Sequence, residues 1–170
     1  MTETTTENIQ PLFNNPGKHS NATDNKIYML NNYKTGDIGY GCAQSLNSST
    51  TITLNAGEYA KISVYVKTAN LNTENTGSGY NKEIGANIRV TNSFNTDSQS
   101  DFGIFNIITD PQTNEWQEYV FYVKADSVYS SKFALVLGLG YNDYAAEGTA
   151  YFDDITVKVL DQTEYNKEIK

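Results

Sequence analysis

Two neighbouring carboxylates, Asp153 and Asp154, are the side chains whose types and spacing suggest chemistry most directly. Strict strand alternation starting at Phe152 would place Asp154 in the core and Ile155 in water. A bulge at the two aspartates restores the alternation, because a bulge inserts one extra residue into a strand. The sequence therefore predicts a bulge there, with an inward-facing set made of Phe152, Ile155, Val157 and Val159.

Adjacent carboxylates at a bend repel each other unless a cation or hydrogen-bond donors compensate their charge. Ca2+ is the natural candidate for such a cation, since it takes hard oxygen ligands such as carboxylates. We therefore expect Asp153 and Asp154 to be ligands of a structural Ca2+, the alternative being a bulge held by backbone donors alone.

Groups for catalysis are few. The chain has one histidine, His19, and one cysteine, Cys42, which excludes a multi-histidine metal centre, an internal disulfide and a cysteine-rich zinc site. A Ser-His-Asp triad would need His19 as its base, yet His19 lies in a polar stretch typical of a solvated loop. Asp153 and Asp154 are neighbours on a strand, the wrong geometry for the paired carboxylates of a glycosidase. We predict that the protein is not an enzyme.

Exposed rings beside hydrogen-bonding side chains are suited to sugars, whose C–H faces stack on rings and whose hydroxyls need donors and acceptors. Alternation places Tyr65, Glu118 and Tyr122 on the outward faces of two predicted strands, and Arg89 on that of a third. If these strands share a sheet, the four side chains line one groove. The alternatives are tyrosines half-buried by their cross-strand neighbours and an arginine that is solvated or ion-paired.

A second possible sugar site lies between two predicted strands, where Tyr141 and Tyr144 flank Asn142 and Asp143. Two rings and two polar groups so close together are unusual for a plain turn. The alternative is a loop that packs against the sheets. Trp116, the single tryptophan, begins a predicted strand and is interpreted as a packing residue.

Strands must position these side chains, because apolar residues recur with a period of two through the middle of the chain. The clearest strands are predicted at 61–67 and 118–124. Others are predicted at 26–31, 40–46, 50–54, 86–92, 102–109, 132–139 and 149–160. No segment has a convincing helical period. Many short strands without helices predict an all-β fold, an antiparallel two-sheet β-sandwich of the jelly-roll type.

Length and composition indicate one acidic domain. The 170 residues carry 12 Lys and Arg against 20 Asp and Glu, a formal net charge of -8. A negative surface disfavours nucleic acid and anionic membranes as partners. No apolar run is long enough to span a bilayer, and the first residues lack the features of a signal peptide. Residues 1–25 are predicted as a linker or poorly ordered segment, 26–160 as the domain and 161–170 as a C-terminal linker stub.

Four segments of the chain resemble a known family when taken in order. They are GEYAKISVYVKT at 57–68, NEWQEYVFYVKA at 114–125, FALVLGLG at 133–140 and GTAYFDDITV at 148–157. Together they resemble the jelly-roll carbohydrate-binding modules appended to xylanases and other secreted polysaccharide-degrading enzymes, and related sandwich domains of bacterial surface proteins. The resemblance covers roughly residues 26–160.

The resemblance implies a sugar site on the concave face of one sheet or on a loop-rimmed edge. It also implies a structural Ca2+ held by the closing Phe-Asp-Asp segment, in which Asp153 matches the acidic position and Asp154 lies beside it. The start of the chain departs from the family, because residues 7–17 do not match the usual opening whose Glu completes the ion site. An extracellular or cell-surface location follows, with secretion directed by a segment outside this sequence.

Two functions from different classes remain open. The first is a non-catalytic carbohydrate-binding module, a monomer joined to neighbouring domains that binds a polysaccharide or glycan chain. The second is a structural or adhesive spacer module of a multidomain extracellular surface protein, since a fold does not fix a function. A polysaccharide lyase would need a convergent set of His, Tyr, Lys or Arg side chains, and with His19 alone it is not predicted.

Overall fold

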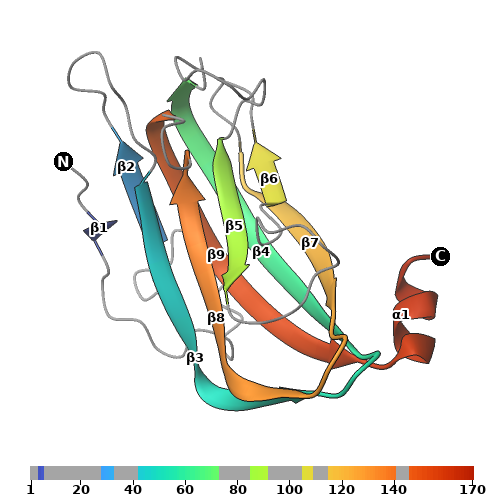
Figure 1. The fold of residues 1–170 in the computed structure, drawn as a ribbon. Helices are drawn as coiled ribbons and strands as arrows, with labels where there is room; N and C mark the ends of the chain where they lie inside the picture. The colour runs from blue at the N-terminus through green and yellow to red at the C-terminus, as the bar shows by residue number, and fades with distance from the viewer. Residues whose placement is uncertain are drawn as a thin grey trace, which may run out of the picture.

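The computed structural model describes residues 4–5, 28–32, 42–72, 85–91, 105–108, 115–140 and 146–170. They form two antiparallel sheets and one short helix that follows the last strand (Figure 1). The strands are β1 (Thr4–Thr5), β2 (Tyr28–Asn32), β3 (Cys42–Leu54), β4 (Tyr59–Asn72), β5 (Ala86–Thr91), β6 (Phe105–Ile108), β7 (Gln117–Lys124), β8 (Tyr129–Leu139) and β9 (Glu147–Leu160). The helix is α1 (Gln162–Glu168).

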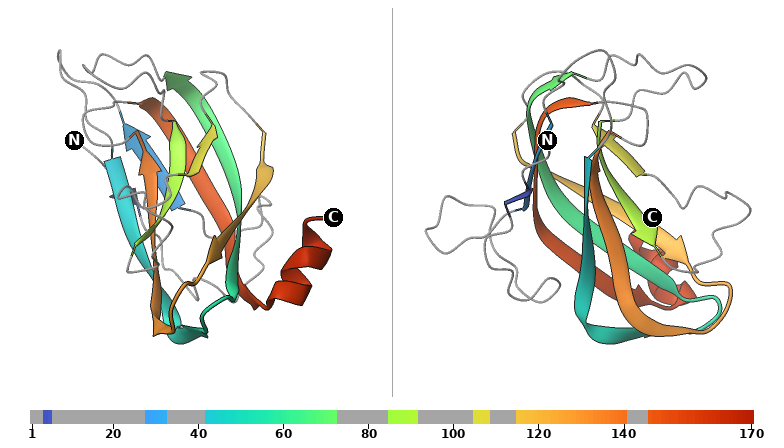
Figure 2. Two further views of the ribbon diagram at one scale, coloured as in Figure 1. Left: turned by 45° about the vertical axis from the view of Figure 1, so that its right-hand side comes forward. Right: turned by 60° about the vertical axis from the view of Figure 1, so that its left-hand side comes forward.

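The strand order identifies the fold. The five-stranded sheet has the order β1-β2-β9-β4-β7, and the four-stranded sheet has the order β3-β8-β5-β6. Every strand pair is antiparallel. Apart from β1, this is the order of a jelly roll, whose chain crosses repeatedly between two stacked sheets. The predicted all-β, antiparallel two-sheet sandwich is confirmed, and Figure 2 shows the two layers from further sides.

Strands β3 and β1 differ most from the prediction. The segments 40–46 and 50–54 belong to one strand, β3, whose register against β8 shifts between Asn47 and Thr51. Because the shift interrupts the alternation, the sequence pattern predicts two strands where the structure has one. Thr4 and Thr5 pair with β2 although they lie in the segment predicted as a linker.

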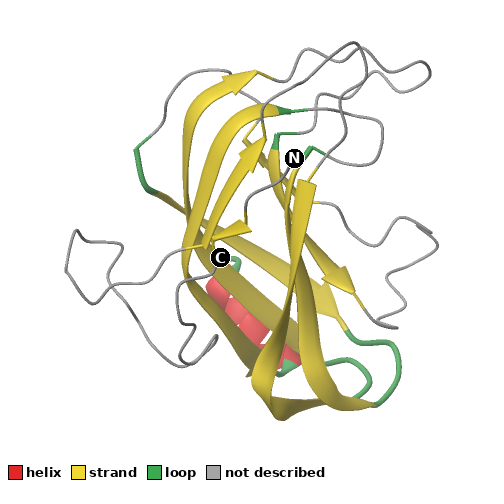
Figure 3. Ribbon diagram, turned by 90° about the vertical axis from the view of Figure 1, so that its left-hand side faces the viewer, coloured by secondary structure: helices red, strands yellow, loops and turns green. Residues whose placement is uncertain are grey.

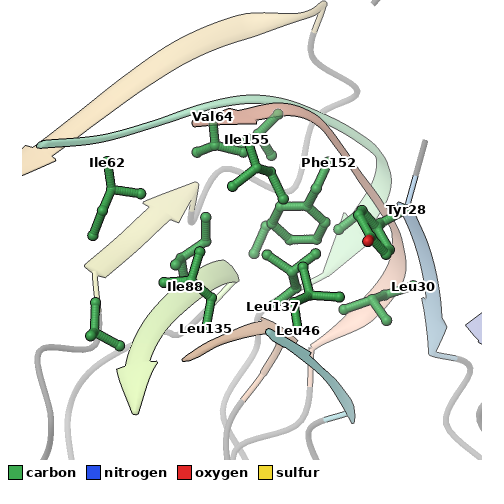
Figure 4. Packing of buried hydrophobic residues seen from close by; sticks show 14 of the residues in the cluster. Tyr28, Leu30, Leu46, Ile62, Val64, Ile88, Leu135, Leu137, Phe152 and Ile155 are labelled. Carbon is green, nitrogen blue, oxygen red and sulfur yellow. The ribbon is translucent and has the colours of Figure 1, made fainter. Parts of the chain in front are cut away.

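The core lies between the two sheets. In β4 the inward residues Ile62, Val64 and Val66 are fully buried, whereas the residues that alternate with them are partly exposed. Ile88 of β5 and Leu135 of β8 belong to the same cluster, and Figure 4 shows side chains of both sheets meeting there. Each such side chain contributes about 1.5–3 kcal/mol when it is fully buried. One face of each sheet is thus committed to the core, which leaves the opposite faces for binding.

The predicted bulge in β9 is confirmed. The register of β9 against β4 shifts at Asp153 and Asp154, and Asp154 has a left-handed backbone with a φ of 49°. The Asp153 carboxylate accepts a hydrogen bond from the Asp154 N–H at 2.8 Å, so one aspartate side chain holds the backbone of the next. The inward-facing residues that pack in or against the core are, as predicted, Phe152, Ile155, Val157 and Val159.

Helix α1 corrects the prediction of a linker stub without helix over 161–170. It begins with a capping box, in which Asp161 accepts from the Glu164 N–H and Glu164 accepts from the Asp161 N–H. The box satisfies two backbone donors that a helix start otherwise leaves without partners. Figure 3 shows the helix at one end of the sandwich, against the strands. At seven residues the helix is too short to give a clear helical period in the sequence.

Tyr28 brings a hydroxyl group into the core. Its ring lies near Leu30 and Phe152 (Figure 4), and only 9% of the residue is exposed. Within the described part of the chain, its hydroxyl oxygen is buried and has no hydrogen-bond partner. Burial raises the pKa of this hydroxyl, since the charged form would lose its hydration.

Tyr28→Phe is therefore expected to stabilise the domain by about 1 kcal/mol or more, because a buried polar group without a partner costs about 1–3 kcal/mol. Phenylalanine keeps the packing of the ring and removes the hydroxyl. Urea unfolding of both proteins measures the difference in the free energy of unfolding. A clear loss of stability would mean that the hydroxyl has a partner in solution.

Candidate functional site

Tyr65 and Glu118 lie opposite each other on the outer face of the five-stranded sheet. They are register partners on β4 and β7, and the Tyr65 hydroxyl donates to the Glu118 carboxylate over 3.4 Å. Both point away from the core, into which the neighbours of Tyr65, Val64 and Val66, are packed. The negative charge of Glu118 is the main cause of the raised pKa of the Tyr65 hydroxyl, and Asp154 acts in the same direction. The structure thus brings these two predicted residues together.

Two more rings lie beside this pair. Tyr151 of β9 is the register partner of Lys67 of β4, two residues along from Tyr65. Trp116 contacts the Tyr151 ring edge-to-face, with ring centroids 6.4 Å apart and an angle of 62° between the planes. Both rings are partly exposed. We use the name central patch for Tyr65, Lys67, Trp116, Glu118 and Tyr151.

Trp116 and Tyr151 were not among the predicted site residues. The sequence does carry the signal that places them: Tyr151 precedes the inward Phe152 by one residue, and Trp116 precedes the outward Glu118 by two. Alternation puts both on the outer face. Trp116 does pack, as predicted, but against a ring of the outer face.

Arg89 lies in the other sheet. It belongs to β5, which pairs with β8 and β6 in the four-stranded sheet. The outer faces of the two sheets point in opposite directions, so the core separates Arg89 from Tyr65. The groove predicted for Tyr65, Arg89, Glu118 and Tyr122 required one shared sheet, and the structure does not bring Arg89 to the other three.

Asn87, two residues before Arg89 on β5, is fully buried. Its side-chain amide donates to the backbone carbonyls of Gly85 at 3.0 Å and Gly140 at 3.1 Å. The side chain lies over Gly138, where an added Cβ would come within 2.5 Å of the Asn87 Oδ1. Asn87 therefore ties two strand ends together and is not available to a ligand.

Tyr122 lies on the same outer face as Tyr65 but under helix α1. Its hydroxyl donates to the Glu168 carboxylate at 3.1 Å. Its register partner Lys61 forms an ion pair with Glu168, and the hydrogen bond from Lys61 is the main cause of the lowered pKa of Glu168. Four residues along β7 separate Tyr122 from Glu118, a distance of about 13 Å. Tyr122 is therefore not part of the central patch.

The two aspartates of the bulge do not form a Ca2+ site by themselves. Asp153 is 5% exposed, and its carboxylate already accepts the Asp154 N–H. Across the described ranges, no group of three or more Asp, Glu, His or Cys side chains is arranged to hold a metal ion. Ca2+ takes about six to eight oxygen ligands. The structural Ca2+ stays a prediction.

The second predicted sugar site, at Tyr141 and Tyr144, lies outside the described residues. Comparisons with protein-family models and with curated proteins found no match for this chain. In the part of the chain that the structure describes, no helix is long and apolar enough to cross a membrane.

Proposed function

We propose that the domain is a non-catalytic carbohydrate-binding module whose central patch binds a polysaccharide or glycan chain. The observation that supports this most is the pair Tyr65 and Glu118, an aromatic ring and a carboxylate facing each other on an exposed sheet face. Trp116 and Tyr151 extend the aromatic surface beside them. A pyranose offers one apolar face and several hydroxyls, so it needs a ring and polar groups side by side.

Three residues of the central patch have distinct parts in this proposal. The Tyr65 ring stacks on the sugar, the Glu118 carboxylate accepts from its hydroxyls, and the Lys67 ammonium donates to them. Asp153 is the other register partner of Tyr65. Because carboxylates lie on both sides of the ring, the central patch is suited to a neutral glycan and would repel an anionic one.

The protein would then work outside the cell or at its surface, joined to neighbouring domains of a longer chain. A polymer gains affinity from several rings in a row, and the central patch offers the rings of Tyr65, Trp116 and Tyr151. No catalytic group is needed for this role.

Tyr65→Ala is expected to weaken glycan binding about two- to tenfold, because loss of one stacking ring forfeits about 0.5–1.5 kcal/mol beyond its buried area. A glycan array identifies the ligand, and calorimetric titration then compares the variants. Tyr65→Phe keeps the ring and is expected to bind nearly as well as the unaltered protein. Val128→Ala is the surface control, since Val128 is 69% exposed and follows the end of β7 opposite to the one that carries Glu118.

The stability of all three variants should stay within about 1 kcal/mol of the unaltered protein, because none removes a buried side chain. Equal affinity of Tyr65→Ala and the unaltered protein would exclude the central patch as the site. Absence of binding to any glycan would favour the spacer module, the other function that the sequence leaves open.

A further inference from the structure

Helix α1 covers a second group of rings on the same outer face. Tyr165 of the helix stacks on Tyr59 of β4, with ring centroids 3.9 Å apart and planes inclined by 3°. It also meets Tyr122 of β7 edge-to-face at 5.1 Å. Tyr59 is only 8% exposed, although it points outward beside its register partners Lys124 and Leu160. Without the helix, the rings of Tyr59 and Tyr122 would face water.

Lysines surround these two rings. Lys61 and Lys158 are register partners on β4 and β9, and Lys61 also pairs with Tyr122 on β7. The Lys124 Nζ lies 5.7 Å from the centre of the Tyr59 ring. In a chain with a net charge of -8, this is a local concentration of positive charge. We use the name helix-covered patch for Tyr59, Lys61, Tyr122, Lys124 and Lys158.

The helix presents a flat ring, a carboxylate and an amide to this patch. Its tyrosine stacks on Tyr59, and its Glu168 carboxylate pairs with Lys61 and accepts from the Tyr122 hydroxyl. The side-chain carbonyl of Gln162 accepts from the Tyr59 hydroxyl at 3.0 Å. A uronic acid residue of a glycan combines the same features, since it has a ring with an apolar face, a carboxylate and oxygen acceptors.

We propose that the helix-covered patch is a binding site for a uronic acid residue of a glycan, and that helix α1 occupies this site until the ligand displaces it. The uronate ring takes the place of the helix tyrosine on Tyr59. Its carboxylate takes the place of Glu168 beside Lys61 and Tyr122. The inference rests on the proposed carbohydrate-binding function and adds a site with the opposite charge preference to the central patch.

Helix α1 is attached weakly enough for a ligand to displace it from the helix-covered patch. None of its seven residues is buried, so the core does not depend on it. The ion pair between Lys61 and Glu168 joins partly exposed side chains, where water and salt weaken it. A helix of this length is marginal on its own in water, so its position depends on the patch beneath it.

The test uses the full chain with the double substitution Tyr165→Ala and Glu168→Ala, which removes the stacked ring and the carboxylate. The probe is trigalacturonic acid, with galactotriose as its neutral counterpart, titrated calorimetrically at low salt. If the helix covers the site nine-tenths of the time, the double variant is expected to bind the uronate about tenfold more tightly. Thr163→Ala is the matched helix control, since Thr163 is exposed, and it is expected to bind as the unaltered chain does.

Lys61→Gln added to the double variant is expected to weaken uronate binding about tenfold, because a close charge pair is lost. It should leave the binding of neutral glycan at the central patch unchanged. Hydrogen exchange of the backbone amides measures directly how often the helix opens in the unaltered chain. The amide of Tyr165, which donates to the Asp161 carbonyl, should exchange faster when trigalacturonic acid is added.

The outcomes separate this inference from the proposed function. Tighter uronate binding by the double variant, lost with Lys61→Gln, supports the inference even if no neutral glycan binds at Tyr65. Equal uronate affinity of the double variant and the unaltered chain, or tight binding with unchanged exchange of the helix amide, overturns the displacement. Absence of uronate binding in every variant overturns the site, while neutral glycan binding that depends on Tyr65 would leave the proposed function standing.

Discussion

Deletion of Thr156 is expected to abolish folding, because it exchanges the inside and the outside of the last part of β9. If the bulge is kept, Lys158 turns into the core and Val157 into water. If the bulge is lost, Asp154 turns inward and Ile155 outward. Either arrangement forfeits about 1.5–3 kcal/mol for each large apolar side chain exposed and adds the larger cost of a buried charge. The sum is comparable to the total stability of a typical domain, about 5–15 kcal/mol.

Deletion of Asp154 is the matched control, and it is expected to leave the domain folded. In the structure, Tyr65 pairs with Asp153 and Ser63 pairs with Thr156. Between these two pairs β9 has two residues, whereas β4 has one. Removing Asp154 makes the two strands equal in length there and leaves every inward residue facing inward. Circular dichroism and the dispersion of amide NMR signals compare the two deletions. If both variants fold equally well, the bulge does not set the register of β9.

Gly148→Ala is expected to destabilise the domain by about 2–6 kcal/mol, the sum of backbone strain and overpacking. Gly148 has a φ of 120°, which side-chain-bearing residues rarely adopt. A Cβ there would lie 2.5 Å from the carbonyl oxygen of Asn70 and 2.8 Å from that of Ala69. Both atoms belong to the backbone of β4 where its register against β9 is irregular, so neither moves without breaking the pairing.

Gly57→Ala provides the comparison for this substitution. Gly57 also has a positive φ, 90°, yet a Cβ there would have no atom within 4 Å. It shares the conformational cost of about 1–3 kcal/mol but not the clash. Thermal unfolding of both variants should therefore show a larger loss for Gly148→Ala. Equal losses would mean that β4 moves away from the added methyl group at little cost.

The side-chain alternation of single strands could be predicted from the sequence, because it is a local property. The bulge at Asp153 and Asp154 followed from the same pattern, since one extra residue was needed to keep Ile155 inside. The position of Tyr65 opposite Glu118 could be predicted only in part. Alternation predicted that both side chains point outward, but the pairing of β4 with β7, which brings them together, is known from the structure.

The assignment of strands to sheets could not be predicted in this way. Alternation says that Arg89 points away from the core but not which of the two outer faces it is on, because sheet membership depends on pairing between distant segments. Helix α1 was missed for a different reason. Tyr165 is the only aromatic or aliphatic residue in its sequence QTEYNKE, so the helix has no apolar stripe, and its stability comes from a capping box and from the rings beneath it.

β9, the last strand of the sandwich, lies in the middle of the larger sheet. β9 is flanked by β2 and β4, both of which are made long before it. During translation, the four-stranded sheet can pair as soon as β8 has left the ribosome, but its apolar side chains, among them Leu135 and Leu137, then have no complete second layer to cover them. Pairing between distant segments is slow, and uncovered apolar surface favours aggregation. We therefore expect the nascent domain to cover these side chains only once β9 has inserted between β2 and β4.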